Sequence, residues 1–263
     1  MLALIAGTGA LPPALVACLP ARPLICAMAG FAPALTPDVT FRIEHLGSFL
    51  ANLKARGVDE VCMAGAVRRP DIDQTKIDAA TLPLVPRIAS AIAKGDDGAL
   101  REIIGIFEEA GLAVRAAHQI APGLLPDAGV PTKTIITDQT RDDAALAEQI
   151  IAQMGAADAG QACLVRGGHV LAREDQSGTD AMIAKFAPVD AKQAELFKAP
   201  KPTQDRRADL PVIGPDTARN AAAAGLAGIV IEAGGVMVLD QPKVLATLDA
   251  AGLFLWVRPK GGA

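Results

Sequence analysis

The chain has 263 residues, enough for one large α/β domain or two smaller ones, and we expect two. Its composition is 51% hydrophobic but only 3% aromatic, so its core must consist mainly of Ala, Leu, Val and Ile. The net charge of −4 offers no basic surface for a polyanion, which argues against nucleic acid as a partner. The four separated cysteines lack a CxxC spacing, which predicts buried thiols and argues against a disulfide frame or zinc site.

Two apolar stretches have the length of an export or membrane signal. The first, residues 1–20, has no basic start and is interrupted by glycine and proline, so it predicts a strand and a turn. The second, residues 221–239, is divided by four glycines, which favours a buried helix end, strand and turn over a bilayer span. We therefore expect a cytoplasmic protein without a transmembrane helix.

The first half of the chain alternates β-type and helical runs. Such alternation is typical of a parallel sheet with helical crossovers, so we expect a Rossmann-like N-terminal domain. The predicted strands cover residues 2–6, 23–28, 41–46, 60–67 and 113–120, and the predicted helices 13–18, 49–56, 85–94 and 99–110.

A change of composition to Pro, Gly and small residues over 121–133 marks the predicted boundary between domains 1–125 and 126–263. The second half has a predicted helix at 143–154, a hairpin at 161–174 and a proline-containing loop at 198–214. We expect a second α/β domain with a mixed sheet, and we expect it to be catalytic.

A glycine-containing loop follows the first predicted strand. Its backbone N–H groups could approach a ligand phosphate at a helix N-terminus, or the loop could be a tight structural turn. A dinucleotide fingerprint needs a glycine where Pro12 stands and an acidic residue after the second strand, and both are missing. The candidate substrate-binding residues of this loop are Gly7, Gly9, Ala10, Leu11 and Pro12.

Charged residues follow two further elements of the first half. Arg69 comes directly after the fourth predicted strand, where parallel sheets bind ligands, so it could hold a phosphate or a uracil edge or lie in a solvated turn. Lys94, Asp96 and Asp97 precede a helix, which the aspartates could cap. They could instead contact the ligand or a metal ion.

The stretch Gly178-Thr179-Asp180-Ala181-Met182 precedes or opens a helix. Thr179 or Asp180 could cap that helix, or the two could orient a diphosphate-bound Mg²⁺. Glu232 is the one charged residue of an apolar strand, so it either meets a cation of the site, as we expect, or lies at a strand end in water. The three histidines have no ligand spacing and are interpreted as structural.

The strongest local concentration of polar groups lies in residues 198–214. Its cations suit the charge on diphosphate oxygens, and a carboxylate suits a metal ion or an attacking water. The prolines reduce the freedom of the loop and so the entropy lost on ordering it. The alternative is a solvated loop with surface ion pairs. The polar candidates are Lys201, Gln204, Asp205, Arg207 and Asp209, and these residues alone do not decide between the two aspartates.

Taken together and in this order, six stretches resemble the LpxI-type UDP-2,3-diacylglucosamine pyrophosphatases of lipid A synthesis. The resemblance extends from Leu4 to about Phe254, and the most specific part is the pattern PKP-Q-x-x-R-x-DLP-x-IG. The matching stretches read LIAGTGALP, AGAVRRPD, KGDDGALR, GTDAM, KAPKPTQDRRADLPVIG and AGLAGIVIEAGG.

The resemblance implies hydrolysis of UDP-2,3-diacylglucosamine to UMP and 2,3-diacylglucosamine 1-phosphate (lipid X) by water, with Mg²⁺ (or Mn²⁺) as cofactor. It also implies an active site between two domains and Asp209 as the essential carboxylate and metal ligand. We expect Gln204 and Arg207 to act with Asp209, and Lys201 to bind phosphoryl oxygens. We further expect a homodimer and at most peripheral contact with the inner membrane.

For this hydrolysis, the segment near residue 205 and the opening loop must line one crevice and together bind the two linked phosphates. Two other functions are compatible with parts of the sequence. The Rossmann-like half could belong to a nicotinamide-dependent oxidoreductase, although the missing glycine and acidic residue argue against it. A non-catalytic UDP-sugar lipid-binding protein would need the same binding residues.

Overall fold

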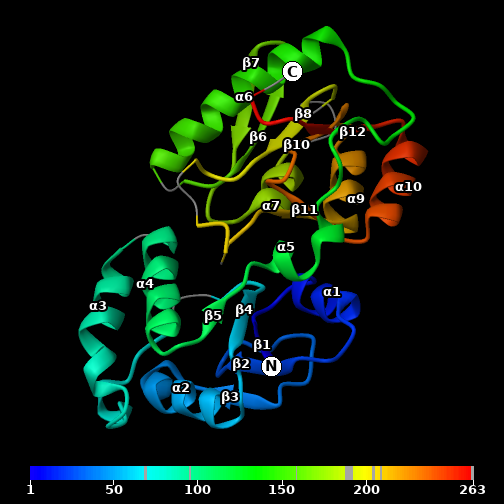
Figure 1. Cartoon of the computed structure of the whole chain (residues 1–263). Coiled ribbons are helices and arrows are strands. Elements are labelled where there is room, and N and C mark those ends of the chain that lie inside the picture. Colours follow the sequence, from blue (N-terminus) through cyan, green and yellow to red (C-terminus); the bar gives the residue numbers. More distant parts are fainter. Residues whose placement is uncertain are drawn as a thin grey trace. The chain divides into compact units, whose positions relative to one another are not determined.

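The computed structural model describes residues 1–67, 70–94, 96–157, 159–186, 192–202, 205–207 and 209–261. The chain forms two compact units. Unit 1 comprises Met1–Pro122 and, from much later in the sequence, Asp205–Asp209; unit 2 comprises Gly123–Gln204 and Leu210–Ala263 (Figure 1). The division at residue 122 falls inside the compositional change at 121–133.

Unit 1 contains a five-stranded parallel sheet of order β3-β2-β1-β4-β5, as expected of a Rossmann-like half. The order reverses direction between β1 and β4, which is the position where open α/β sheets bind ligands. The strands are β1 (Leu2–Ala6), β2 (Leu24–Met28), β3 (Val39–Phe41), β4 (Glu60–Ala64) and β5 (Ala113–Val114). The helices are α1 (Leu11–Cys18), α2 (Leu46–Ala55), α3 (Val85–Ala93), α4 (Asp96–Glu109) and α5 (Ala117–Ile120).

Helices α2, α3 and α4 cover one face of this sheet with aliphatic and phenylalanine side chains. The phenylalanines form a cluster in which Phe41 and Phe49 stack with ring centroids 3.9 Å apart. Phe107 meets Phe49 edge to face at 6.4 Å. Rings in these geometries add stabilisation beyond the area that they bury.

Two strands predicted from the sequence are wrong in part. Residues 41–46 form only the end of β3, followed by a 3₁₀ turn at Ile43–His45 and then α2. This turn places Glu44 in the interior, where Arg42 pairs with it at 2.8 Å. The predicted strand 113–120 ends at Val114 and continues as α5.

Unit 2 contains a mixed five-stranded sheet of order β12-β10-β8-β6-β7, which confirms the predicted fold class. β8, β10 and β12 are parallel, while β6 is antiparallel to both β8 and β7. The strands are β6 (Ala162–Arg166), β7 (His169–Arg173), β8 (Glu195–Lys198), β10 (Gly228–Glu232) and β12 (Phe254–Arg258). The predicted hairpin is β6 and β7, and a separate two-stranded parallel sheet pairs β9 (Val212–Ile213) with β11 (Met237–Val238).

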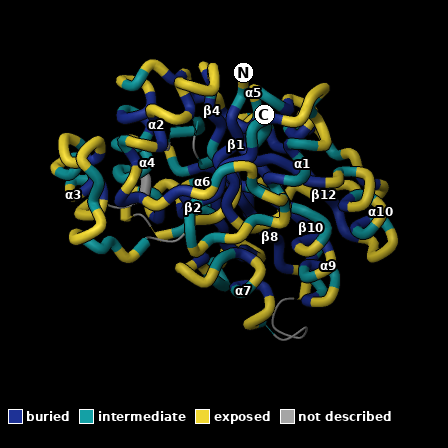
Figure 2. The backbone as a smooth tube through the Cα atoms, turned by 90° about the horizontal axis from the view of Figure 1, so that it is seen from below, coloured by how far each residue is buried: buried dark blue, intermediate teal, exposed yellow. Residues whose placement is uncertain are grey.

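Both faces of the unit 2 sheet are covered by helices. α6 (Asp138–Ala156) packs on the face that carries Phe197 and Trp256. The opposite face packs against α7 (Thr179–Ala184), α9 (Pro215–Ala223) and α10 (Gln241–Ala251). Strands covered on both faces carry few polar side chains, and β8, β10 and β12 are almost wholly buried (Figure 2), whereas the edge strand β7 is not.

Three of the four cysteines are buried, and Cys18 is exposed. Burial raises the pKa of the Cys62 and Cys163 thiols to about 12, so both remain protonated at neutral pH. No helix in the described part of the chain has the length and apolar character needed to cross a membrane.

Candidate functional site

The opening glycine loop is held against the end of β4 at the switch point of the unit 1 sheet. Thr8 and Ala66 exchange two backbone hydrogen bonds of 2.9 Å, and the Gly7 amide donates to the Ala64 carbonyl at 2.8 Å. A Cβ atom on Gly7 would lie 2.5 Å from the Ala66 carbonyl oxygen, so only glycine allows this approach. The loop that follows β1 and the loop that follows β4 therefore form one structural element.

Backbone N–H groups are the donors that this loop can offer a ligand. The amides of Gly9, Ala10 and Leu11 precede the first bond of α1, in which the Ala14 amide donates to the Ala10 carbonyl. Gly9 has a φ of +98°, which favours glycine. Pro12 and Pro13 have no N–H group, so only the amides before them can donate to a phosphate at the start of the helix.

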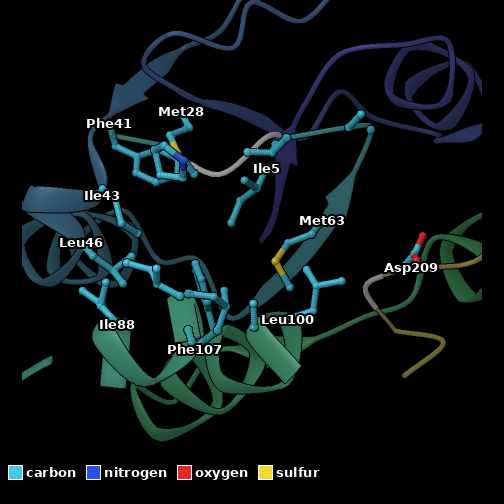
Figure 3. A pocket seen from close by; sticks show the side chains of 18 of the residues that line it. Ile5, Met28, Phe41, Ile43, Leu46, Met63, Ile88, Leu100, Phe107 and Asp209 are labelled. Carbon is cyan, nitrogen blue, oxygen red and sulfur yellow. The ribbon is translucent and has the colours of Figure 1, made fainter. Parts of the chain in front are cut away.

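An apolar cavity of about 360 Å³ lies in unit 1 beside these loops. It is lined by strand ends and by α3 and α4, as the close view shows (Figure 3). Gly65 and Ala66 line it on the side of the glycine loop, and Asp209 lines it from the segment 205–209. The loop after β4, which holds the opening loop, thus shares a cavity with Asp209.

The neighbouring Asp205 has a different environment. Arg207 donates to both of its carboxylate oxygens, at 3.0 and 2.7 Å, and to Glu108 of α4 at 2.6 Å. The Arg207 guanidinium holds the pKa of Asp205 below its usual range. In turn, the hydrogen bond to Asp205 raises the pKa of Arg207. Arg207 therefore fastens the segment to α4 and also holds the carboxylate of Asp205.

His118 of α5 also belongs to this region of unit 1. Burial, and secondarily the charge of Arg206, lowers the pKa of His118, so its ring is neutral at pH 7. Its Nδ1 atom is buried and has no hydrogen-bond partner among the described residues. This environment could not be predicted from the sequence, because no local spacing links His118 to Arg206.

A second, more polar cavity of about 420 Å³ adjoins the carboxyl end of β2. Arg42, Glu44 and Asp71 line it. Glu44 accepts from Arg42 and from the Asp73 amide at 3.0 Å, and these hydrogen bonds lower its pKa to about 2. The buried carboxylate thus anchors the chain after β4 to the 3₁₀ turn that follows β3.

In unit 2, a buried polar network lies at the carboxyl end of β8. The Lys198 ammonium donates to the Thr179 hydroxyl at 2.8 Å and to the Val212 carbonyl at 3.1 Å. The Thr179 hydroxyl in turn donates to Glu174, which also accepts from the Gln161 amide at 2.7 Å. Thr179 is therefore a buried link and does not cap α7.

Neither Lys198 nor Glu174 is among the site residues predicted from the sequence. The available signal was a lysine at the end of an apolar strand, where a buried ammonium needs several acceptors. Lys198 and Val212 are the two ends of the loop that carries residues 205–209, so the network fixes where that loop leaves and re-enters unit 2.

The other predicted residues have varied surroundings. Lys94 pairs with Glu102 of α4, and Asp180 is exposed in the first turn of α7. Lys201 is half-buried beside Gly155 at the end of α6. Glu232 ends β10, where a Cβ atom on Gly235 would lie 2.7 Å from its carboxylate.

Several predicted residues lie outside the described part of the chain. They are Arg69, Gln204 and the side chains of Asp96 and Asp97, which open α4. Within the residues that the structure does describe, no three His, Cys, Asp or Glu side chains form a group able to hold a metal ion by themselves.

Comparisons with known proteins cover both units. Residues 1–124 match the family described as the LpxI N-terminal domain, and residues 127–256 match the LpxI C-terminal domain. The chain is also 38% identical to the UDP-2,3-diacylglucosamine pyrophosphatase LpxI of Caulobacter vibrioides, in an alignment that covers 97% of this chain and 96% of the relative. The chain therefore belongs to the LpxI family.

Proposed function

We propose that this protein hydrolyses the pyrophosphate bond of UDP-2,3-diacylglucosamine to give UMP and lipid X. The likeness to a pyrophosphatase of that name over nearly the whole chain supports the substrate and reaction. The observation that carries the proposal is the environment of Asp209, a carboxylate that lines an apolar cavity at the switch point of a parallel sheet.

Asp209 is the proposed catalytic carboxylate. In this role it activates the attacking water or holds the metal ion, while Asp205 organises the loop through Arg207. The amides of Gly9, Ala10 and Leu11 are proposed donors to phosphate oxygens. Arg69, Lys201, Gln204 and the remaining N–H groups of Arg207 are proposed to neutralise phosphoryl charge.

Mg²⁺ is the proposed cofactor. A site of this ion commonly consists of one or two carboxylates, several waters and the substrate phosphates, so a single carboxylate beside the cavity fits it without a cage of protein ligands. Asp209 would hold the ion. When bound, Mg²⁺ would neutralise charge on the diphosphate oxygens.

Two rival functions use part of the same structure. A nicotinamide-dependent oxidoreductase would share the sheet order, but Pro12 occupies the position of the third fingerprint glycine and Met28 ends β2 where an acidic residue would contact a ribose. A non-catalytic lipid-binding protein would share the apolar cavity. Turnover distinguishes this second rival from an enzyme.

The test is release of UMP from UDP-2,3-diacylglucosamine by the purified protein. We expect release with Mg²⁺ or Mn²⁺ and none when a chelator removes the metal. Binding of the lipid without any UMP release would favour the lipid-binding protein, and a rise of NADH fluorescence on addition of the protein would favour the oxidoreductase.

A homodimer in the cytoplasm with peripheral contact to the inner membrane completes the proposal. Light scattering of the purified protein measures the dimer, and sedimentation with anionic vesicles measures the contact. A polypeptide without a membrane-spanning helix among its described residues should bind such vesicles weakly and reversibly.

A further inference from the structure

The apolar cavity of unit 1 has two different sides. In the close view, Asp209 lies on one side of the lining, and Phe41, Ile43 and Leu46 lie on the opposite side (Figure 3). A ligand with its polar group near Asp209 would therefore extend its apolar part toward Phe41.

The side at Phe41 is closed by well-packed aromatic rings. Phe41 and Phe49 are 8% and 4% exposed and stack at 3.9 Å, and Phe107 supports Phe49 from its edge. By contrast, Val67 and Ile92 line the same cavity and are 41% and 45% exposed. The cavity thus has an apolar entrance near exposed residues and a rigid wall at Phe41.

The lining indicates the chemical class of the occupant. Asp209 is the one charged side chain among the described residues that line the cavity. A nucleotide or sugar placed there would lose hydrogen bonds to water without gaining partners, whereas a hydrocarbon chain would lose none. A volume of about 360 Å³ lies at the small end of ligand cavities, which suits a single chain.

We propose that this cavity holds one acyl chain of the lipid substrate and that Phe41, supported by Phe49, sets the longest chain that fits. The inference rests on the proposed function, because that function supplies an acyl chain beside the diphosphate. Each methylene that enters an apolar cavity strengthens binding roughly fourfold, so a wall produces a maximum in affinity as the chain lengthens.

The test compares kcat/KM over a series of UDP-2,3-diacylglucosamines of increasing acyl length. Phe41→Leu shortens the wall and should raise the ratio of long-chain to short-chain kcat/KM roughly tenfold, the equivalent of one to two methylenes. Ile88→Phe adds volume on the lining helix α3 and should lower the same ratio by a similar factor. Phe254→Leu makes the same change in the core of unit 2 and should leave the ratio unchanged.

Binding of lipid X with the same acyl series, measured by calorimetry, provides a second readout that needs no turnover. Thermal unfolding confirms that each variant is folded, and if Phe41→Leu unfolds, Ile88→Phe still tests the cavity. If the wild type releases UMP but both variants show the same dependence of kcat/KM on acyl length as the wild type, the acyl assignment is overturned and the proposed function stands. If the wild type releases no UMP, but the acyl length that gives the tightest lipid X binding still changes in Phe41→Leu and Ile88→Phe, only the proposed function is overturned.

Discussion

At the scale of single residues, Asp209 lines the apolar cavity, whereas Asp205 is held by Arg207. Asp205 and Asp209 lie in one short segment, and both are compatible with catalysis as residue types. Asp205 accepts the Arg207 amide and guanidinium, which makes it part of the loop's own structure. Residue types alone identified the segment but not the residue, because they do not reveal which aspartate meets Arg207, and only the family resemblance pointed to Asp209.

Glu195 is a second carboxylate with an unusual environment. It is 5% exposed at the start of β8, and its Oε2 atom has no hydrogen-bond partner among the described residues. Burial, partly opposed by a hydrogen bond from Thr140 and increased by the charge of Asp143, raises its pKa from 4.5 to about 7. Asp143 itself accepts the Gly167 and Gly168 amides at 2.7 and 2.6 Å.

Glu195→Gln should remove a pH-dependent loss of stability in unit 2. Below pH 4.5 the Glu195 side chain is protonated in both the folded and the unfolded state, so its raised pKa does not lower the free energy of unfolding. Between pH 4.5 and about 7 the unfolded state loses its proton first, so the free energy of unfolding falls as pH rises, by about 3 kcal/mol in total. Above pH 7 the variant should therefore be more stable than the wild type.

Urea unfolding at pH 5 and pH 8 measures this difference. The one tryptophan, Trp256, lies in β12 of the same unit, so its fluorescence reports on unit 2. Asp142→Asn removes a charge from the exposed surface of α6 and is the control, with no expected change of this size. An equal pH dependence in Glu195→Gln and the wild type would show that Glu195 does not retain its proton.

At the scale of elements, hydrogen bonds between separate segments hold the loop that carries Asp209. The Thr179 hydroxyl joins Lys198 of β8 to Glu174 after β7, and Lys198 also reaches β9 through Val212. A buried ammonium and carboxylate linked through one hydroxyl stabilise the network only while that hydroxyl is present.

Thr179→Val should destabilise unit 2 by about 1–3 kcal/mol, because the isosteric side chain leaves Lys198 and Glu174 with one hydrogen bond fewer each. Thr179→Ser retains the hydroxyl and should retain most of the stability. Chemical unfolding followed by Trp256 fluorescence gives both values. If the valine variant proved as stable as the wild type, the network would have no structural role.

The regular elements could largely be predicted from hydrophobic periodicity. The hairpin β6–β7 and the helices α1 to α4 lie where their patterns predict them, since each of these helices buries an apolar face. The strand predicted at 41–46 failed because the alternation of Phe41 and Ile43 resembles a strand, whereas Glu44 turns inward to meet Arg42. A local pattern does not show that a carboxylate has a buried partner.

At the scale of the whole molecule, the chain belongs to two units, and the segment Asp205–Asp209 belongs to the first although its flanking residues belong to the second. The compositional change near residue 122 could be read from the sequence. The membership of residues 205–209 could not, because it depends on pairs such as Arg207 and Glu108, which are 99 residues apart. The apolar cavity likewise needs strand ends and helices that only the fold brings together.

The most direct test of the account is a comparison of Asp209→Asn with Asp205→Asn in UMP release and in substrate binding. Removing the catalytic carboxylate should lower kcat roughly 10³-fold while binding of UDP-2,3-diacylglucosamine persists, because a positioned general base contributes about 10²–10⁴-fold. Asp205→Asn should lose far less, since it weakens the bonds that hold Arg207 and removes no carboxylate proposed to act on the reacting atoms. An Asp209→Asn protein that is folded and retains turnover near the wild-type rate would contradict the account.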